Sequence, residues 1–533
     1  MRVVAKRNDL RHFVLLWLSD NAVSRLISGE RELPQSVLLQ RAMQGAHGLQ
    51  ALGIGKGDAV ALILRNDFAF FEASLAAGMI GAYATPINWH FTPEEASYII
   101  RDSGARAVLI HSDLWPLMAD AVPAGVQLFV VPTPPEIRAA YGLPETDSAL
   151  GSPGVRVWDT WVASQPPLGA VAPVSPGSMI YTSGTTGRPK GVRREPPTPQ
   201  QQAASMALVA QTLGLSPDER TVVLMNGPMY HSAPNAYGMF SARVGATIVL
   251  QARFDAEETL ALIEHYRITH AHMVPIMFVR LLKLPETVKA KYDLSSLRFI
   301  VHGAAPCPPQ IKRAMIDWWG PVINEYYGAT ETGIPVWHDS YEALRKPGTV
   351  GRVLDGAIVK VFDEAGQELP PGSVGEIYMR ARGITDFTYH GQDDKRREVG
   401  RGELVTVGDV GWVDEEGYVF LCDRKRDMVI SGGVNIYPAE IEAVLIAMPG
   451  VRDCAVFGIP DEEFGESLCA YLELEPGAVV EPASVRSFLA PKLAKYKIPK
   501  VINIAANLPR EDSGKIFKRK LRTPYWERVG RTI

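Results

Sequence analysis

The segment Tyr181-Thr-Ser-Gly-Thr-Thr-Gly-Arg-Pro-Lys-Gly191 brings three glycines, four Ser or Thr hydroxyls and two cations together in eleven residues. Glycines allow backbone N–H groups to converge on phosphate oxygens, hydroxyls add further donors, and Arg188 and Lys190 add positive charge. Residues 178–181 favour a strand, which would place the segment at the edge of a sheet. The segment therefore predicts a phosphate-binding loop.

This loop differs from a Walker A loop, because no Gly-Lys-Ser/Thr sequence closes it and Pro189 precedes the lysine. The alternative interpretation is a flexible surface turn, since Gly and Thr also favour turns. The rest of the chain decides between the two interpretations.

The composition is that of an ordinary globular protein with more than one domain. The chain has 533 residues, of which 46% are hydrophobic and 21% charged, so two or three domains are expected. A net charge of −4 argues against a nucleic-acid binder. Residues 491–533 nevertheless hold twelve Lys or Arg against three Asp or Glu. This excess suits a polyanionic small ligand, or it forms a solvated basic tail.

Cysteine use and apolar runs favour a cytoplasmic protein. The four cysteines show no CxxC spacing and no nearby pair of histidines, so neither a disulfide framework nor a zinc site is predicted. The apolar run at 13–18 is too short for a secretory signal, and the run at 73–87 is too short to cross a bilayer. We therefore expect no transmembrane segment, and peripheral membrane contact stays open.

Helical and strand patterns alternate along the first half of the chain, as in layered α/β proteins. For example, residues 67–77 read as a helix and residues 105–110 as a buried strand. From about residue 350 the pattern changes to antiparallel hairpins, the first formed by residues 358–362 and 375–379. After the charged run 423–427 the pattern predicts a separate small α/β lobe.

Three further segments carry side chains suited to nucleotide chemistry. The segment Glu325-Tyr-Tyr-Gly-Ala-Thr-Glu-Thr-Gly333 combines aromatic rings, which can stack on a base, with a carboxylate that can hold Mg²⁺ beside phosphates. Asp409 lies just before a predicted strand and suits ribose hydroxyls, and Lys515 lies on a glycine-containing loop. Each segment also has an ordinary interpretation, as a turn with a solvated glutamate, a helix or strand cap, or a surface lysine.

Together these segments resemble the ANL superfamily of adenylate-forming enzymes, which contains acyl-CoA synthetases, adenylation domains of peptide synthetases and luciferases. The resemblance covers about residues 35–523. It is carried by seven segments in the family's order, at residues 181–192, 229–234, 303–306, 324–333, 408–412, 423–441 and 509–520. Chance agreement of seven ordered segments is negligible.

The resemblance implies an α/β fold with a large N-terminal domain of layered α/β sheets, a small β-barrel-like subdomain and a small, mobile α+β C-terminal domain. We place the N-terminal adenylation domain at residues 1–423, a hinge at 424–427 and the C-terminal lobe at 428–533. Arg426 occupies the hinge position at which the family usually has Asp or Lys.

The resemblance also implies roles for individual residues. Binding of the β- and γ-phosphates of ATP is expected from Thr182, Ser183, Gly184, Thr185, Thr186, Gly187 and Lys190. Adenine is expected to lie between two segments, Gly303-Ala304-Ala305 and Tyr326-Tyr327-Gly328. The ribose is expected to contact Asp409 and Arg424, and the pantetheine arm of CoA to pass Ser431, Gly432 and Gly433.

Four residues form the expected catalytic set. Thr330 would contact phosphate and Glu331 would hold Mg²⁺, while Lys515 would join the α-phosphate to the carboxylate of the substrate. His231 matches the position that guards the acyl pocket, with a satisfied core histidine as the alternative.

The leading hypothesis is an AMP-forming acyl-CoA synthetase that uses ATP, Mg²⁺ and CoA. The acyl pocket is expected from residues 226–239, 273–276, Phe278 and Val301, which are mostly apolar. No Asp follows residues 237–238 to pair with an α-amine, which argues against an amino-acid substrate. We therefore predict a hydrophobic acid: a medium- or long-chain fatty acid, or a bulky aryl or steroid acid.

Three alternatives remain. A stand-alone adenylation enzyme could load a carrier protein instead of CoA. A luciferase-like oxygenase has no specific signal in the sequence, and Lys515 and Glu331 argue against a nucleotide sensor without catalysis. Homodimers are common among the relatives, so the oligomeric state stays open.

Overall fold

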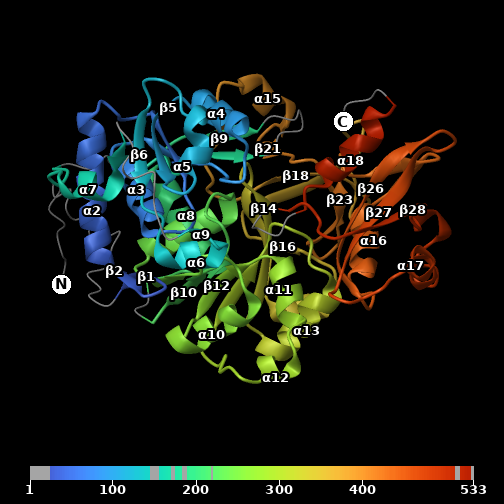
Figure 1. Cartoon of the computed structure of the whole chain (residues 1–533). Coiled ribbons are helices and arrows are strands. Elements are labelled where there is room, and N and C mark those ends of the chain that lie inside the picture. Colours follow the sequence, from blue (N-terminus) through green and yellow to red (C-terminus); the bar gives the residue numbers. More distant parts are fainter. Residues whose placement is uncertain are drawn as a thin grey trace, which may run out of the picture.

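The computed structural model describes residues 24–144, 155–169, 175–182, 189–217, 220–510 and 516–529. Figure 1 shows a large body of sheets and helices with a smaller lobe, coloured orange to red, beside the strands β18 and β23. Within the described ranges, no helix combines the length and the apolarity needed to cross a membrane.

The first sheet is entirely parallel. Its spatial order is β4 (Tyr83–Pro86), β3 (Ala59–Ile63), β5 (Ala105–His111), β6 (Gln127–Val131) and β7 (Arg156–Val157). Every residue of β3 is buried, as expected for a parallel strand covered on both faces by helices. The helices around this sheet are α2 (Gln35–Ala51), α3 (Phe68–Met79), α4 (Pro93–Asp102), α5 (Trp115–Met118), η1 (Ala119–Ala121), α6 (Pro135–Tyr141) and α7 (Trp158–Ala163).

The second sheet begins with one antiparallel edge strand and continues with parallel strands. Its order is β2 (Arg31–Pro34), β1 (Arg25–Ser28), β11 (Thr247–Leu250), β10 (Val222–Met225), β12 (His270–Met273), β13 (Phe299–His302) and β14 (Ile323–Ala329). The helices in this part are α8 (Pro199–Leu213), α9 (Ser232–Arg243), α10 (Ala256–Tyr266), α11 (Pro275–Leu282), α12 (Glu286–Lys289) and α13 (Pro309–Trp319). One apolar core joins the two sheets, because it contains alternate residues of β3 and β10 together with α2 and α3.

Antiparallel strands extend the second sheet beyond β14. Their order is β15 (Gly333–His338), β16 (Gly351–Val353), β23 (Tyr418–Arg424), β22 (Asp409–Val413), β18 (Gly375–Arg380), β21 (Leu404–Val405) and β20 (Gly400–Arg401), and β18 also pairs with β17 (Ile358–Phe362). Two short helices accompany them, α14 (Ser340–Arg345) and α15 (Asp393–Glu398). A separate three-stranded sheet consists of β19 (Phe387–Tyr389), β9 (Lys190–Arg194) and β8 (Ile180–Thr182).

The C-terminal lobe has its own sheet and its own apolar core. The strands are β25 (Val434–Ile436), β24 (Val429–Ser431), β27 (Gly465–Leu474), β26 (Val451–Asp461) and β28 (Val501–Ala505). The helices are α16 (Pro438–Leu445), α17 (Pro482–Leu489), η3 (Lys495–Lys497) and α18 (Lys518–Glu527). Lys283 of the large body docks this lobe, since its Nζ donates to the carbonyls of Val451 and Arg452 at 3.0 and 3.1 Å.

The elements expected from the sequence are present. The helix predicted at 67–77 is α3, with Asp67 as its N-cap, and the strand predicted at 105–110 is β5. The hairpin predicted at 358–362 and 375–379 is formed by β17 and β18, in antiparallel register. These matches confirm the layered α/β fold with a small C-terminal domain.

Candidate functional site

One continuous cavity of about 3180 Å³ contains most of the predicted site residues. It opens where three parallel strands of the second sheet end. His231 follows β10, Ala304 and Ala305 follow β13, and Thr330 and Glu331 follow β14. The carboxyl ends of parallel strands are where open α/β sheets bind ligands, so the topology itself brings these residues together.

Two strands flank the predicted phosphate loop. Thr182 ends β8 and Lys190 begins β9, the two are paired across the hairpin, and both line the cavity. Lys190 is buried, and its Nζ lies 5.0 Å from the centre of the Tyr389 ring. Burial lowers the pKa of Lys190. The remaining loop residues of the prediction, Ser183, Gly184, Thr185, Thr186 and Gly187, lie outside the described residues.

Glu331 has two hydroxyl donors. The Thr182 Oγ1 donates to Glu331 Oε1 at 3.1 Å, and the Tyr389 hydroxyl donates to the same oxygen at 3.2 Å. The backbone of the loop is held from behind by Arg194, whose guanidinium donates to the carbonyls of Thr330 and Glu331. The carboxylate is therefore fixed both at its side chain and at its backbone.

The adenine segment is built around close approaches. A Cβ on Gly303 would lie 2.8 Å from the Tyr326 ring, and a Cβ on Gly328 would lie 1.9 Å from the carbonyl oxygen of Gly333. Only glycine fits at these two positions. Ala304 has a φ of 66°, in the left-handed region that L-residues rarely adopt. Strained backbone of this kind concentrates at ligand sites.

Tyr326 and Tyr327 are adjacent on β14 and have different partners. The Tyr326 hydroxyl lies 3.0 Å from His272 Nε2, and burial lowers the pKa of that histidine to about 4. The Tyr327 hydroxyl donates to Asp409 Oδ2 at 2.7 Å. Burial, followed by the charge of Asp409, raises the pKa of Tyr327.

The predicted ribose pair is assembled. Asp409 and Arg424 face each other across β22 and β23, with Arg424 Nε 3.3 Å from Asp409 Oδ1. Both line the cavity. Because Tyr327 and Arg424 each take one side of the carboxylate, its orientation is set before any ligand binds.

His231 is the N-cap residue of α9 and lines the cavity. The loop before it is held by Asn66, a buried residue that follows strand β3 of the first sheet. The Asn66 side chain donates to the Gly227 carbonyl at 2.8 Å and accepts from the Met229 amide at 2.9 Å. The Asn66 side-chain amide thus uses both its donor and its acceptor on the loop at residues 227–229.

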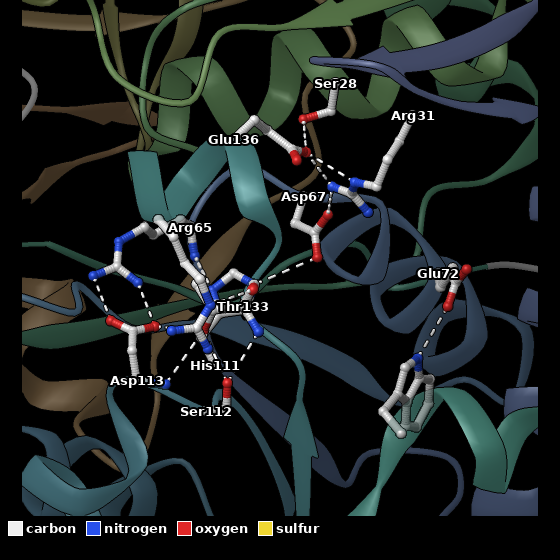
Figure 2. Close-up of polar contacts among 12 residues, drawn as sticks. Ser28, Arg31, Arg65, Asp67, Glu72, His111, Ser112, Asp113, Thr133 and Glu136 are labelled. Atoms are coloured by element: carbon white, nitrogen blue, oxygen red, sulfur yellow. Dashed lines mark hydrogen bonds and ion pairs between the residues drawn. The ribbon is translucent and has the colours of Figure 1, made fainter. Parts of the chain in front are cut away.

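The neighbours of Asn66 are fixed by an ion-pair network (Figure 2). Asp67 accepts from Arg31 at 2.7 Å and lies 3.4 Å from His111 Nε2, while Arg65 pairs with Asp113 at 2.9 Å. Burial opposes ionisation of Asp67, but the hydrogen bond from His111 and the charge of Arg31 lower its pKa to about 2. Asn66 therefore lies between two residues, Arg65 and Asp67, that are each fixed by an ion pair.

Away from the nucleotide residues, helices provide apolar wall to the same cavity. The apolar lining residues from α2, α3, α8 and α9 include Leu39, Leu75, Met79, Met206, Val209, Leu213, Met239 and Phe240. Arg243 lines the cavity as well, with its guanidinium 5.4 Å from the centre of the Phe240 ring. Residues 273–276 line it as expected, but Phe278 and Val301 lie in the apolar core instead, so their predicted place in the pocket is wrong.

The predicted residues of the C-terminal lobe divide into two groups. Ser431, Gly432 and Gly433 form the turn between β24 and β25 and do not line the cavity, whose lining stops at Met428 and resumes at Tyr437. Lys515 lies outside the described residues, but the next residue, Ile516, lines the cavity.

The carboxylate and hydroxyl oxygens at Glu331 are of the kind that ligates a hard divalent cation. Within the described ranges, no group of three or more His, Cys, Asp or Glu residues could hold a metal ion by itself. Mg²⁺ usually takes one or two protein carboxylates and completes its shell with substrate phosphates and water. Glu331, with the Thr182 and Tyr389 hydroxyls beside its carboxylate, fits that pattern.

Sequence reasoning missed Arg194, Tyr389 and Asn66. Arg194 lies three residues after the quoted phosphate segment and could have been noticed as a cation close to it. Tyr389 and Asn66 carry no local signal, because only the folded sheets bring them to Glu331 and to the loop at residues 227–229.

Comparison with known proteins gives a consistent result over the whole chain. The family described as "AMP-binding enzyme" matches residues 23–387, and "AMP-binding enzyme C-terminal domain" matches residues 440–515. The chain is 32% identical over 511 residues to the fatty acid–[acyl-carrier-protein] ligase ScoC of Streptomyces coeruleorubidus, covering 94% of this chain and 93% of the relative.

Two further relatives extend the comparison. The chain is 34% identical over 499 residues to a feruloyl-CoA synthase of Amycolatopsis sp., covering 93% and 94% of the two chains. Its structure is similar to that of ATP-bound MatB from Rhodopseudomonas palustris, with a TM-score of 0.80, 28% identity and coverage of 97% and 99%. These similarities agree with the family predicted from the sequence.

Proposed function

The chain belongs to the family of AMP-binding enzymes, the adenylate-forming ligases, and on that premise we propose that it is an acyl-CoA synthetase for a hydrophobic carboxylic acid. The observation that carries the proposal is the single cavity. It joins Glu331 and the Asp409–Arg424 pair to the apolar wall made by α8 and α9. A nucleotide and an acyl chain can therefore meet in one continuous cavity.

In the first reaction, a carboxylate oxygen of the acid attacks the α-phosphorus of ATP. A new C–O–P bond forms, the bond to pyrophosphate breaks, and the products are acyl-AMP and pyrophosphate. Both reactants are anions, so their repulsion is the main barrier that the site must offset. The acid is already ionised at neutral pH, so this step needs no general base.

The residues of the chain share this electrostatic task. Asp409 and Arg424 hold the ribose, and Thr182 and Lys190 contact the phosphates. Lys515 neutralises the charge that builds at the α-phosphorus. Thr330 contacts phosphate, and Glu331 would hold Mg²⁺, which when bound supplies positive charge to the pyrophosphate leaving group. Each positioned charge of this kind is worth roughly 3 kcal/mol of transition-state stabilisation.

In the second reaction, the thiolate of CoA attacks the carbonyl carbon of acyl-AMP, the thioester forms and AMP leaves. The loop Ser431–Gly433 is outside the cavity, whereas Ile516 lines it. This arrangement fits the first reaction. We infer that the C-terminal lobe rotates about residues 424–427 before the second reaction and brings the glycine turn to the pantetheine arm.

The acid is proposed to be a fatty acid or a bulky aryl acid. Support comes from the apolar cavity wall and from relatives whose names specify fatty acid and ferulate. ScoC also raises the second candidate, transfer to a carrier protein, because its name specifies an acyl-carrier-protein acceptor. Among the described residues, α8 adds Met206, Val209 and Leu213 to the apolar wall, which supports a large hydrophobic acid.

The decisive experiment separates the two reactions. Enzyme, ATP, Mg²⁺ and a panel of acids are incubated with CoA and without it, and acyl-AMP, AMP and thioester are quantified. We expect pyrophosphate release without CoA and thioester only with it. Acyl-AMP without thioester at any CoA concentration would favour the carrier-protein acceptor, and a strong preference for acetate would contradict the hydrophobic pocket.

The Lys515→Ala variant gives the internal test. It is expected to lower acyl-AMP formation by at least about a hundredfold, as for loss of one preorganised charge. Conversion of supplied acyl-AMP to thioester should continue, because Lys515 leaves the site in the rotated arrangement. An equal loss in both reactions would contradict the rotation.

A further inference from the structure

We propose that Arg194 and Tyr389 are positioning residues for the Glu331 carboxylate, and that together they fix its geometry for the divalent cation of the ATP complex. This inference rests on the proposed function, because it takes Glu331 as the cation ligand. Neither residue belongs to the motifs that predicted the site.

The first argument comes from the two oxygens of Glu331. Thr182 and Tyr389 both donate to Oε1, from opposite edges of the small sheet β19–β9–β8. In the part of the chain that the structure describes, Oε2 has no hydrogen-bond donor, although Glu331 lines the cavity. The two hydroxyls therefore fix Oε1, and among the described residues Oε2 is the oxygen available to a ligand.

The second argument comes from the backbone behind that carboxylate. Arg194 donates to three carbonyl oxygens, those of Thr330, Glu331 and Thr385, with the contact to Glu331 at 3.0 Å. A guanidinium presents five N–H groups in a rigid plane, so one side chain can hold three acceptors at once. Lysine has a single nitrogen and would not reproduce this geometry.

The environment of Arg194 indicates that its charge is also used. Burial lowers the pKa of this arginine to about 10, and the nearby carboxylates of Glu331 and Asp386 oppose that shift. Among the described residues, no carboxylate lies within ion-pair distance of Arg194, and it donates to neutral carbonyls instead. Its charge is therefore not neutralised by a direct partner, and it lies against the backbone of the loop that carries Glu331.

The neighbouring residue provides a matched control. Arg193 is adjacent on β9, and its side chain points to the other face, where its Nε donates to the Tyr83 hydroxyl at 3.1 Å. Arg193 does not line the cavity. A variant at Arg193 therefore removes an equally long cation from the same strand without touching the loop that carries Glu331.

The test measures metal binding rather than turnover. Mn²⁺ is used as a paramagnetic probe for the Mg²⁺ site, with full-length enzyme and ATP in the absence of any acid, and free Mn²⁺ is quantified by electron paramagnetic resonance. ATP binding in EDTA is measured in parallel. The variants are Tyr389→Phe, Arg194→Gln, Arg194→Lys and the control Arg193→Gln.

Tyr389→Phe is expected to weaken Mn²⁺ binding to the enzyme–ATP complex about fivefold, and Arg194→Gln about thirtyfold, as for the loss of one or several hydrogen bonds on a charged group. Arg194→Lys should recover less than half of the Mn²⁺ binding free energy that Arg194→Gln loses. ATP binding in EDTA and the Mn²⁺ affinity of Arg193→Gln should stay within about twofold of the native enzyme.

Native Mn²⁺ affinity in Tyr389→Phe and Arg194→Gln would overturn the proposal, and so would an equal loss of ATP binding with and without metal. If Arg194→Gln does not fold, Tyr389→Phe decides alone, since it removes a single oxygen atom. The proposed function fails separately: an enzyme that binds Mn²⁺ and ATP as described but forms no acyl-AMP from any acid would refute only the acyl-CoA synthetase activity.

Discussion

Two loops close on the same cavity and are held in opposite ways. The loop at residues 227–231 is held by the neutral amide of Asn66, whereas the loop at residues 329–331 is held by the cation Arg194 and by two hydroxyls. A neutral bond fixes a position and adds little field. A buried charge fixes a position and also acts on other charges, at about 4 kcal/mol for unit charges 4 Å apart near a protein surface.

This difference matches the ligands proposed for the two sides. In the proposed function, the polyanionic nucleotide would face the loop at residues 329–331, here called the charged loop, and the apolar acyl chain would face the loop at residues 227–231, here called the neutral loop. We therefore expect variants of the charged loop to lower the rate of acyl-AMP formation, and variants of the neutral loop to change which acid is bound.

The largest effect is expected from Glu331→Gln, which keeps the shape of the side chain and removes its charge. The rate of acyl-AMP formation, measured as pyrophosphate release, should fall roughly a hundredfold or more. Conversion of supplied acyl-AMP to thioester should change less than about threefold, because no pyrophosphate leaves in that reaction. A comparable fall in both reactions would mean that the two loops do not differ in the way described.

An intermediate effect is expected from Asn66→Ala, which removes both hydrogen bonds to the loop before His231. The KM for the acid should rise about tenfold and the KM for ATP should stay within about twofold, since one or two buried hydrogen bonds are worth roughly 1–2 kcal/mol. Steady-state kinetics with each substrate varied in turn measures the two constants.

Asn324→Ala is the matched control for this variant. Asn324 is a buried neutral amide on β14 that donates to the Val322 carbonyl and does not line the cavity. It should lower stability without changing the ratio of the two KM values. If Asn66→Ala raised both constants equally, the neutral loop would not act specifically on the acid.

The sequence predicted the residues that lie on local motifs and missed those that depend on tertiary contacts. Asp409 and Arg424 were predicted as a pair, and the structure places them opposite each other on two strands. Thr182, Lys190, Thr330 and Glu331 were also predicted, and all four line the cavity. Each of these residues belongs to one of the short segments that carry the resemblance to the ANL superfamily.

Phe278 and Val301 illustrate the opposite case. The sequence predicts them in the acyl pocket as part of a mostly apolar set, yet both lie in the core. An apolar residue has the same pattern whether it faces a core or a cavity, so periodicity cannot separate the two. The wall from α8 was missed for the same reason. Asn66 was missed because its partner loop is 161 residues away in the sequence.

The smallest effect on activity is expected behind the neutral loop, at Asp67, where the substitution acts on the stability of the fold. The pKa of Asp67 is lowered to about 2 from an ordinary 3.8, so the ionised side chain stabilises the fold by roughly 2 kcal/mol at neutral pH. Because the folded pKa is the lower one, this stabilisation is complete above about pH 5 and is lost as the pH falls towards 2. Urea unfolding should therefore show Asp67→Asn less stable than the native chain at pH 7, with the difference shrinking at pH 3.

The control is Asp317→Asn, which removes an exposed ion pair with Arg313 and should change stability by less than about 0.5 kcal/mol at either pH. If the difference in stability for Asp67→Asn were the same at both pH values, the charge of Asp67 would not contribute to it. The neutral loop would then be supported by uncharged contacts both at Asn66 and at the residues next to Asn66.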